Sequence, residues 1–238
     1  MNIPLRPPRS SQLEWLDDSQ AVAAELTSNL ADIRRLNAWF GGTHLVKRYV
    51  GETLSDPGSY SLLDIATGSA DIPVALVRWA PKQEMALRVV GLDAEPRVLA
   101  DAREVVGDLP VQLVLGDARA LPFDNGAFDM VTCSLALHHF NPEEAVQVLA
   151  EAWRVARRGL LVVDLTRGYL AWLGAWLATR TVARNRMTRH DGPLSVLRAY
   201  TPKEMQSLAL RAEIPNAQSR THPFFRQSLL ARRDVRDD

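Results

Sequence analysis

Apolar and polar residues alternate in blocks along the middle of the chain. Five short, continuous apolar runs predict strands at residues 61–66, 87–92, 111–115, 128–133 and 160–165. Apolar residues three or four positions apart predict helices between them, at residues 72–79, 96–106 and 142–157. Continuous apolar runs are typical of strands that are buried on both faces. The pattern therefore predicts an α/β fold with a mostly parallel sheet and helices on both faces.

Both ends of the chain depart from this alternation. Residues 13–49 have helical spacing, and residues 1–12 are predicted to form a flexible arm. Residues 168–200 hold an aromatic helical segment and then a polar, arginine-rich stretch, which we interpret as a cap inserted after the fifth strand. We therefore divide the chain into an N-terminal arm and helical cap segment at 1–50 and one domain at 51–238.

Helix and strand signals resume near the C-terminus. Thr201 and Glu204 have the spacing of a capping box, which predicts a helix that begins after Thr201. A closing strand is predicted near residues 224–230. The cap is therefore expected to be followed by a helix and a further strand of the same domain.

Composition narrows the class of protein. The 238 residues carry 28 Lys plus Arg and 28 Asp plus Glu, and this zero formal charge gives no sign of nucleic-acid binding. Cys133 is the single cysteine, so nothing indicates an oxidising compartment. The most apolar stretch, 159–178, is interrupted by Asp164 and Arg167, which argues against stable membrane insertion. We expect a cytoplasmic enzyme that is a monomer or a homodimer.

Polar residues lie where three predicted strands end. The segment from Asp64 to Asp71 joins a strand to a helix through small residues, so a ligand can approach the backbone and the helix amides. Asp93 ends the second strand, where a carboxylate can accept both hydroxyls of a ribose, and Asp117 follows the third strand. Open α/β sheets bind ligands at this edge. The three segments together predict a cofactor site.

These segments resemble the motifs of class I S-adenosylmethionine-dependent methyltransferases over roughly residues 60–166. Residues 64–70 resemble the first motif of the family, Asp93 its ribose-binding acid, and Asp117 the acid that reads the adenine amino group. Residues 121–124 and 128–131 resemble the run into the fourth strand. The resemblance implies a Rossmann-like seven-stranded sheet, S-adenosylmethionine as cofactor and a small-molecule acceptor.

The resemblance also implies which residues contact the cofactor. These are Asp64, Ala66, Thr67, Gly68, Asp93, Ala94, Asp117, Ala118, Ser134 and Leu135. Ala66 and Ala70 stand where the family often has glycine, so their methyl groups narrow the turn, while Gly68 keeps its central position. No metal site is expected.

Histidines are the candidate bases for the acceptor. His138 and His139 follow the fourth strand, in the loop that faces the transferred methyl group in this fold, and an alternative role is packing around the donor. His190 lies in the predicted cap beside Asp191, which can orient it and make it more basic; the alternative there is an exposed polar loop. Apolar residues of the cap share one helical face, which suits either a core or a flat acceptor: Tyr169, Trp172, Leu173, Trp176 and Leu177.

Several functions are compatible with these features. We favour O-methylation, because an oxygen acceptor benefits from a base such as these histidines. A looser similarity to methyltransferases of quinone and polyketide pathways favours a small aromatic or lipophilic acceptor such as a phenol, quinone or polyketide. The alternatives are a C-methyltransferase of quinone biosynthesis, a cofactor-binding protein without catalysis, and a nicotinamide-dependent oxidoreductase. The last would need a clean G-x-G-x-x-G turn, which is missing. Residues 134–137, Ser-Leu-Ala-Leu, argue against the amino-methylating enzymes of nucleic acids.

Overall fold

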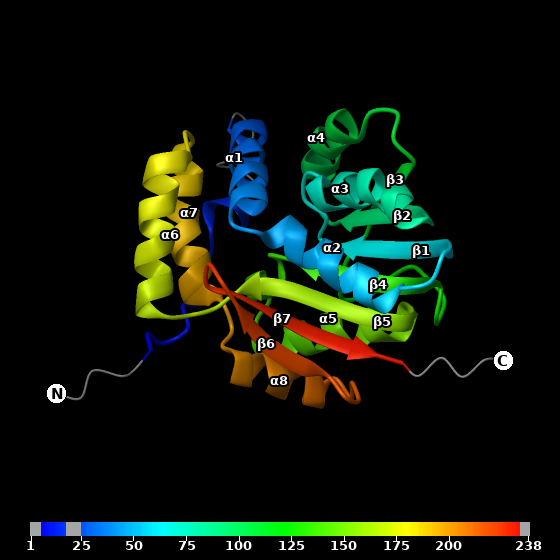
Figure 1. Cartoon of the computed structure of the whole chain (residues 1–238). Helices are drawn as coiled ribbons and strands as arrows, with labels where there is room; N and C mark the ends of the chain where they lie inside the picture. Colours follow the sequence, from blue (N-terminus) through cyan, green and yellow to red (C-terminus); the bar gives the residue numbers. More distant parts are fainter. Residues whose placement is uncertain (1–5, 18–24, 234–238) are drawn as a thin grey trace.

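The strands form a single seven-stranded sheet (Figure 1). The computed structural model describes residues 6–17 and 25–233. Its strands are β1 (Gly58–Ile65), β2 (Met85–Asp93), β3 (Val111–Leu115), β4 (Phe128–Ser134), β5 (Ala156–Leu165), β6 (Gln218–His222) and β7 (Arg226–Arg232). They lie in the order β3-β2-β1-β4-β5-β7-β6, and only the two pairs that involve β7 are antiparallel. The predicted mostly parallel, Rossmann-like sheet is confirmed, and its strand order reverses between β1 and β4.

Helices cover both faces of the sheet, as predicted. They are α1 (Leu26–Trp39), α2 (Gly42–Thr53), α3 (Asp71–Trp79), α4 (Pro96–Val106), α5 (Pro142–Val155), α6 (Tyr169–Val182), α7 (Arg186–Arg198) and α8 (Pro202–Arg211). One buried cluster joins the sheet to α2 and α3, and another joins its opposite face to α5 and α8. Leu62 and Leu63 of β1 belong to different clusters because successive side chains of a strand point to opposite faces.

Local sequence signals set several helix ends. α4 and β3 have the predicted bounds, and α8 begins with the predicted capping box, in which the Thr201 hydroxyl accepts from the Glu204 amide. β6 was not predicted, because its five residues are mostly polar and lie at the edge of the sheet. Because β6 is exposed, its sequence lacks the alternation of apolar and polar residues on which a strand prediction depends.

The N-terminal segment differs from its prediction. Residues 13–49 are divided into a short 3-10 helix, η1 (Trp15–Asp17), and the helices α1 and α2, while residues 1–5 and 18–24 lie outside the described residues. From residue 6 onward the predicted flexible arm is packed rather than free. Arg9 donates to the carbonyl oxygens of Arg198, His138 and Phe140. The arm is therefore part of the structure around the fourth-strand loop.

The predicted cap is a helical hairpin. The arginine-rich stretch, left open as a possible polar loop, forms α7, which packs against α6 and beside α1 (Figure 1). The helix was missed because its polar residues are buried instead of facing solvent, among them Thr188, Asp191 and Ser195. The aromatic face of α6 is neither core nor pocket, since Leu173 and Leu177 are more than half exposed. Among the described helices, none has the length and apolarity of a membrane span.

The turn between β1 and α3 has an unusual backbone. Ala66, Gly68 and Ala70 all have positive φ angles, of 51°, 57° and 57°. This left-handed region costs an L-residue roughly 1–2 kcal/mol, because its Cβ crowds the following carbonyl, whereas glycine has no such penalty. The two alanines therefore store strain in the turn that the sequence identified as the cofactor motif.

We expect Ala66→Gly to stabilise the protein. Removing the strain stabilises the folded state by more than the added chain entropy of glycine stabilises the unfolded state. The free energy of unfolding should therefore increase by about 0.5–1 kcal/mol. Urea unfolding measures this gain. The matched control is Ala100→Gly in α4, an exposed helical position where the same change should cost about 1 kcal/mol. Equal destabilisation by both substitutions would show that the turn is not strained.

Candidate active site

A cavity of about 310 Å³ lies at the carboxyl ends of the central strands. Seven of the predicted cofactor residues line it, and the structure brings them together from three strand ends: Asp64, Ala66, Thr67, Gly68, Asp93, Ser134 and Leu135. This position is the one that open α/β sheets use for ligands, since β1 and β4 diverge where the strand order reverses. We refer to it as the lower cavity.

Asp64 is the buried carboxylate of this cavity. It is 2% exposed, and it accepts the hydroxyls of Thr67 at 2.8 Å and Thr132 at 2.6 Å. Burial raises its pKa to about 7 against the effect of these two hydrogen bonds, and the negative charges of Asp71 and Asp93 act in the same direction as burial. Asp64 therefore joins β1, the turn and β4.

Asp93 links the turn after β1 to the loop after β2. Its two oxygens accept the backbone amides of Gly68 at 2.9 Å and Glu95 at 3.1 Å. Burial raises the pKa of this carboxyl group, and the backbone hydrogen bonds partly oppose the shift. Each carboxylate oxygen has a further lone pair, so Asp93 can still accept hydrogen bonds from a ligand.

Three predicted cofactor residues do not line the lower cavity: Ala94, Asp117 and Ala118. The Asp117 carboxylate is bound by the guanidinium of Arg119, which also pairs with Glu144 at 2.7 Å. Ala118 is buried in the core beneath α5. In this structure the acid after β3 is therefore tied to a surface ion pair, and its contact with an adenine stays a prediction.

Sequence reasoning missed the residues that the N-terminal segment adds to the lower cavity. Asn37 of α1 lines it and donates to the Asp71 carboxylate at 2.8 Å. Leu16 and Asp17 of η1 also line it. These residues lie far from the motif in sequence, and their types occur on any helix surface, so no local signal indicated them.

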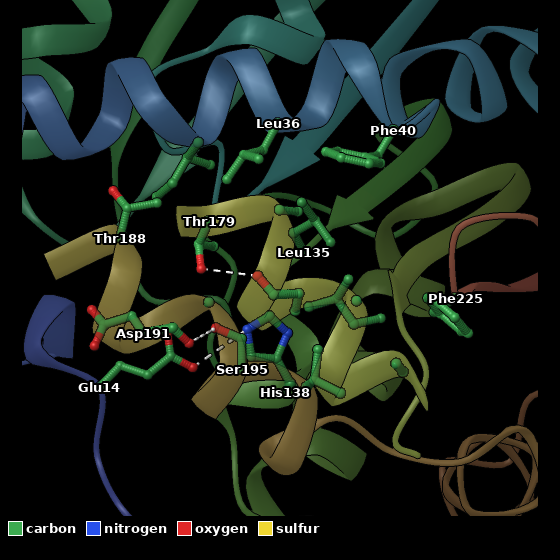
Figure 2. Close-up of a pocket in the computed structure, with 18 of the residues that line it drawn as sticks. Glu14, Leu36, Phe40, Leu135, His138, Thr179, Thr188, Asp191, Ser195 and Phe225 are labelled. Atoms are coloured by element: carbon green, nitrogen blue, oxygen red, sulfur yellow. Dashed lines mark hydrogen bonds and ion pairs between the residues drawn. The ribbon is translucent and has the colours of Figure 1, made fainter. Parts of the chain in front are cut away.

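A second, mostly apolar cavity of about 240 Å³ lies beside the first. Figure 2 shows residues that line it. We call it the upper cavity. Its walls come from η1, α1, the loop after β4, α6, α7 and the turn between β6 and β7. The two cavities share four lining residues: Leu16, Ile33, Leu135 and His139. A ligand in one cavity would therefore lie next to a ligand in the other.

Buried carboxylates hold the helices over the upper cavity. Asp32 of α1 accepts the amides of Arg184 and Asn185, ahead of α7. Asp191 of α7 accepts the amides of Trp15 and Leu16 in η1. Charge-assisted hydrogen bonds of this kind are roughly twice as strong as neutral ones. The helices over the upper cavity are therefore held together by contacts between segments that are distant in sequence.

His138 lines the upper cavity and is oriented by a carboxylate. Its Nδ1 lies 2.7 Å from the Asp164 Oδ1, and its backbone amide donates to the other oxygen of Asp164. Burial acts to raise the pKa of Asp164, but its electrostatic attraction to the His138 ring and the hydrogen bond between them outweigh it and lower the pKa. A carboxylate at Nδ1 fixes the ring orientation and leaves Nε2 for other partners.

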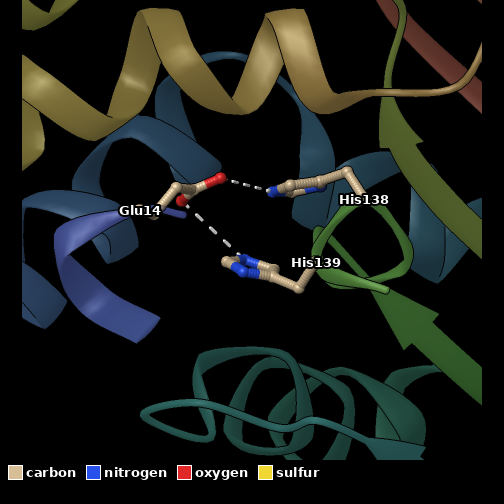
Figure 3. A group of neighbouring side chains, drawn as sticks. All are labelled: Glu14, His138 and His139. Carbon is tan, nitrogen blue, oxygen red and sulfur yellow. Dashed lines mark ion pairs between the residues drawn. The ribbon is translucent and has the colours of Figure 1, made fainter. Parts of the chain in front are cut away.

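Glu14 lies between the two predicted histidines (Figure 3). Its oxygens are 3.6 Å from the Nε2 of His138 and 3.9 Å from the Nε2 of His139. The low-polarity surroundings act to lower the pKa of His139, but the charge of Glu14 and the hydrogen bond to Asp17 raise it to about 9. His139 is therefore largely an imidazolium at neutral pH.

These three side chains also have the spacing of a possible metal site. One ligand atom from each of Glu14, His138 and His139 lies within 4.8 Å of the other two. The guanidinium of Arg198, however, lies 3.8 Å from a Glu14 oxygen and supplies a positive charge in the same place. We therefore interpret the cluster as an ion-pair network, and the absence of a metal site stays a prediction.

The third predicted histidine lies outside both cavities. The His190 ring stacks on Trp15 with centroids 4.1 Å apart, and its Nδ1 lies 2.7 Å from Asp191. Asp191 orients the His190 ring, as expected, but the ring packs against Trp15 of η1. Trp176 also lies outside the upper cavity, where α6 contributes only small residues such as Gly174 and Ala175.

Comparisons with known proteins agree with this arrangement. A family model described as a methyltransferase domain matches residues 62–159. Residues 62–159 therefore belong to a methyltransferase-domain family. A solved plantazolicin methyltransferase in complex with S-adenosylhomocysteine has the same fold, with a TM-score of 0.68 at 12% identity over 92% of each chain. An S-adenosylmethionine-dependent methyltransferase from Aquifex aeolicus has a TM-score of 0.62 at 16% identity, covering 87% of this chain and 97% of its own.

Several curated relatives of this chain are named after quinone biosynthesis. A demethylmenaquinone methyltransferase from Thermus thermophilus is 43% identical over 43% of this chain and 45% of its own length. One from Deinococcus radiodurans is 38% identical over 41% of this chain and 39% of its own. A ubiquinone/menaquinone biosynthesis C-methyltransferase from Dinoroseobacter shibae is 33% identical over 63% and 62%. The chain thus spans two fifths to three fifths of these relatives.

The turn after β1 leaves open space for a ligand in the lower cavity. Gly68 has a φ of 57°, and nothing lies within 4 Å of the position that a Cβ would take there. A ligand can therefore approach the turn backbone without displacing a side chain. The surrounding acceptors and amides suit a ribose and an amino-acid group.

Asp64 should make the stability of the protein depend on pH. Its pKa is about 7 in the folded protein against an ordinary value of 3.8, so the folded state holds the proton more tightly. Stability should therefore fall as pH rises through this window, by up to about 4 kcal/mol at roughly 1.4 kcal/mol per pKa unit.

The measurement is urea unfolding of wild type and Asp64→Asn at pH 5 and pH 8. The stability of the variant relative to wild type should rise with pH, because only wild type carries the buried charge. The exposed substitution Asp56→Asn is the control and should leave the pH dependence unchanged. A constant difference between Asp64→Asn and wild type would show that Asp64 does not titrate in this range.

Proposed function

We propose that this methyltransferase methylates a ring carbon of a compact, hydroxylated aromatic acceptor such as a quinol. The observation that carries the proposal is the His138–Asp164 pair in the wall of an apolar cavity that adjoins the cofactor motif. The names of the curated relatives favour a quinone-type acceptor and, for the C-methyltransferase, carbon as the nucleophile. We therefore place C-methylation ahead of the O-methylation that the sequence favoured.

The upper cavity is the proposed acceptor site. Its volume is below the range of about 300–1,000 Å³ that is typical for drug-sized ligands, which suits one or two fused rings. Apolar walls from Leu36, Phe40 and Phe225 suit a flat ring face (Figure 2). The proposed cap is formed by residues 13–50 and 168–200, together with the β6–β7 turn, which was not part of the sequence prediction.

The lower cavity is the proposed cofactor site. Bound S-adenosylmethionine supplies a methyl group on a sulfonium, already activated for in-line displacement. Asp93 would accept the ribose hydroxyls, the Gly68 turn would leave the backbone open to the ligand, and Leu135 would separate the two sites as a shared wall. These residues position the reactants and exclude water, which is the main requirement of methyl transfer.

His138 is the proposed base. The Asp164 carboxylate holds its Nδ1, so its Nε2 can take the proton of an acceptor hydroxyl. Loss of this proton places electron density on the adjacent ring carbon, which makes that carbon nucleophilic. Glu14 beside Nε2 stabilises the imidazolium that forms.

The test is methyl transfer to a 1,4-dihydroxynaphthalene with a short prenyl chain at C2, using a deuterated methyl donor. Mass spectrometry and NMR should identify a methyl group on C3. His138→Gln should lower turnover by roughly 10²–10⁴-fold with product-nucleoside affinity unchanged. His190→Gln, outside both cavities, is the control. A methyl ether as product would refute carbon as the nucleophile, and full activity of His138→Gln would refute the base.

A second experiment tests the cofactor site. Asp93→Ala should weaken S-adenosylhomocysteine binding by about 1–3 kcal/mol, because ribose hydroxyls and two backbone amides lose an acceptor. Calorimetric titration measures this loss. Asp108→Ala, an exposed acid just beyond α4, is the matched control. Equal affinities of all three proteins would remove Asp93 from the site.

A further inference from the structure

Arg226, the first residue of β7, is a buried cation without a carboxylate partner among the described residues. It is 4% exposed, and the only hydrogen bond of its side chain there runs from Nε to the Phe40 carbonyl oxygen at 2.9 Å. Its Nη1 is fully buried and has no partner. A buried charge without a counter-ion is strongly unfavourable, so such a residue calls for an explanation.

The other two buried arginines are fully engaged, which makes Arg226 exceptional. Arg167 donates to two carbonyl oxygens and pairs with Glu204 at 2.6 Å. Arg198 pairs with Asp17 and donates to the carbonyl oxygens of Gln12, His138 and His139. The guanidinium groups of Arg167 and Arg198 therefore have the ion pairs and hydrogen bonds that a structural role requires. Within the described part of the chain, the guanidinium of Arg226 lacks an ion pair.

The nearest negative charges are occupied by other groups. Burial lowers the pKa of Arg226 to about 10, and Asp164 and Asp71 act against this shift from a distance. Asp164 is bound to His138, and Asp71 accepts from Asn37. Arg226 therefore remains charged at neutral pH, and neither carboxylate forms a salt bridge with it.

Packing holds the guanidinium in place. A Cβ on Gly42 would lie 3.1 Å from the Arg226 Cζ, so the missing side chain lets the guanidinium lie against the start of α2. Arg226 also lines the upper cavity together with Leu135 and Phe225, and it is not among the residues of the lower cavity. A positioned, unpaired guanidinium beside an apolar cavity matches a site for an anionic oxygen.

We propose that Arg226 binds an anionic oxygen of the acceptor, namely the phenolate or enolate oxygen on the ring that is methylated. The proposal rests on the function proposed above and adds a rule of specificity: the acceptor must carry an acidic ring hydroxyl. The guanidinium would stabilise the charge left when the hydroxyl proton moves to His138. The methionine carboxylate of the cofactor is the other possible source of an anionic oxygen.

The test compares two naphthoquinones that differ in one ionisable group. The hydroxyl of 2-hydroxy-1,4-naphthoquinone is ionised at neutral pH, whereas 2-methoxy-1,4-naphthoquinone has no charge. Calorimetry on the full chain saturated with S-adenosylhomocysteine should show that wild type binds the hydroxy compound at least about tenfold more tightly. Arg226→Met should reduce this preference to about twofold or less, and Arg226→Lys should retain part of it.

Controls separate the possible outcomes. Arg220→Met, an exposed arginine of β6, should keep the wild-type preference, and thermal unfolding establishes that each variant is folded. An unchanged preference in Arg226→Met, or no preference in wild type, overturns the proposal. Weaker S-adenosylhomocysteine binding by Arg226→Met with the preference intact would assign Arg226 to the cofactor carboxylate and also overturn it. Because these are binding measurements, a failed methyl-transfer assay would refute the proposed function without affecting this result.

Discussion

The arrangement of segments around the upper cavity depends on the buried guanidinium of Arg198. It donates to the Asp17 carboxylate and to backbone carbonyls of His138 and His139, so one side chain joins η1, the loop after β4 and α7. An arginine suits this role because its five donors point outward in one plane. Without it, η1 would lose its ion pair with α7, and the backbone of the two histidines would lose a donor that links it to α7.

The cofactor half of the fold was predictable from sequence because its signals are local. A buried parallel strand is a continuous apolar run, and the turn that follows it brings Asp64, Thr67 and Gly68 to one place within five residues. Asp93 follows from the same rule at the next strand. Asp117 shows where this reasoning stops, since a strand end gives the position of a side chain but not its partner, here Arg119.

The lining of the upper cavity was predicted only in outline. Segments outside the alternation contribute much of it, but Glu14 and Arg226 there, and Asn37 in the lower cavity, carried no sequence signal because their positions arise from long-range contacts. Trp176 and His190, whose residue types suggest a pocket, lie outside both cavities. Buried polar residues on α7 also concealed its helical period, since amphipathic patterns assume that polar groups face water.

The residues that line the upper cavity lie far apart along the chain, so they are synthesised at different times. Residues 58–165 contain the five parallel strands, whereas the upper cavity also needs Leu16 near the beginning of the chain and Arg226 near its end. During N-to-C synthesis the cofactor half can therefore fold before the ribosome releases the last strand. The strand ends that line the lower cavity are therefore made before Arg226 can complete the wall of the upper cavity.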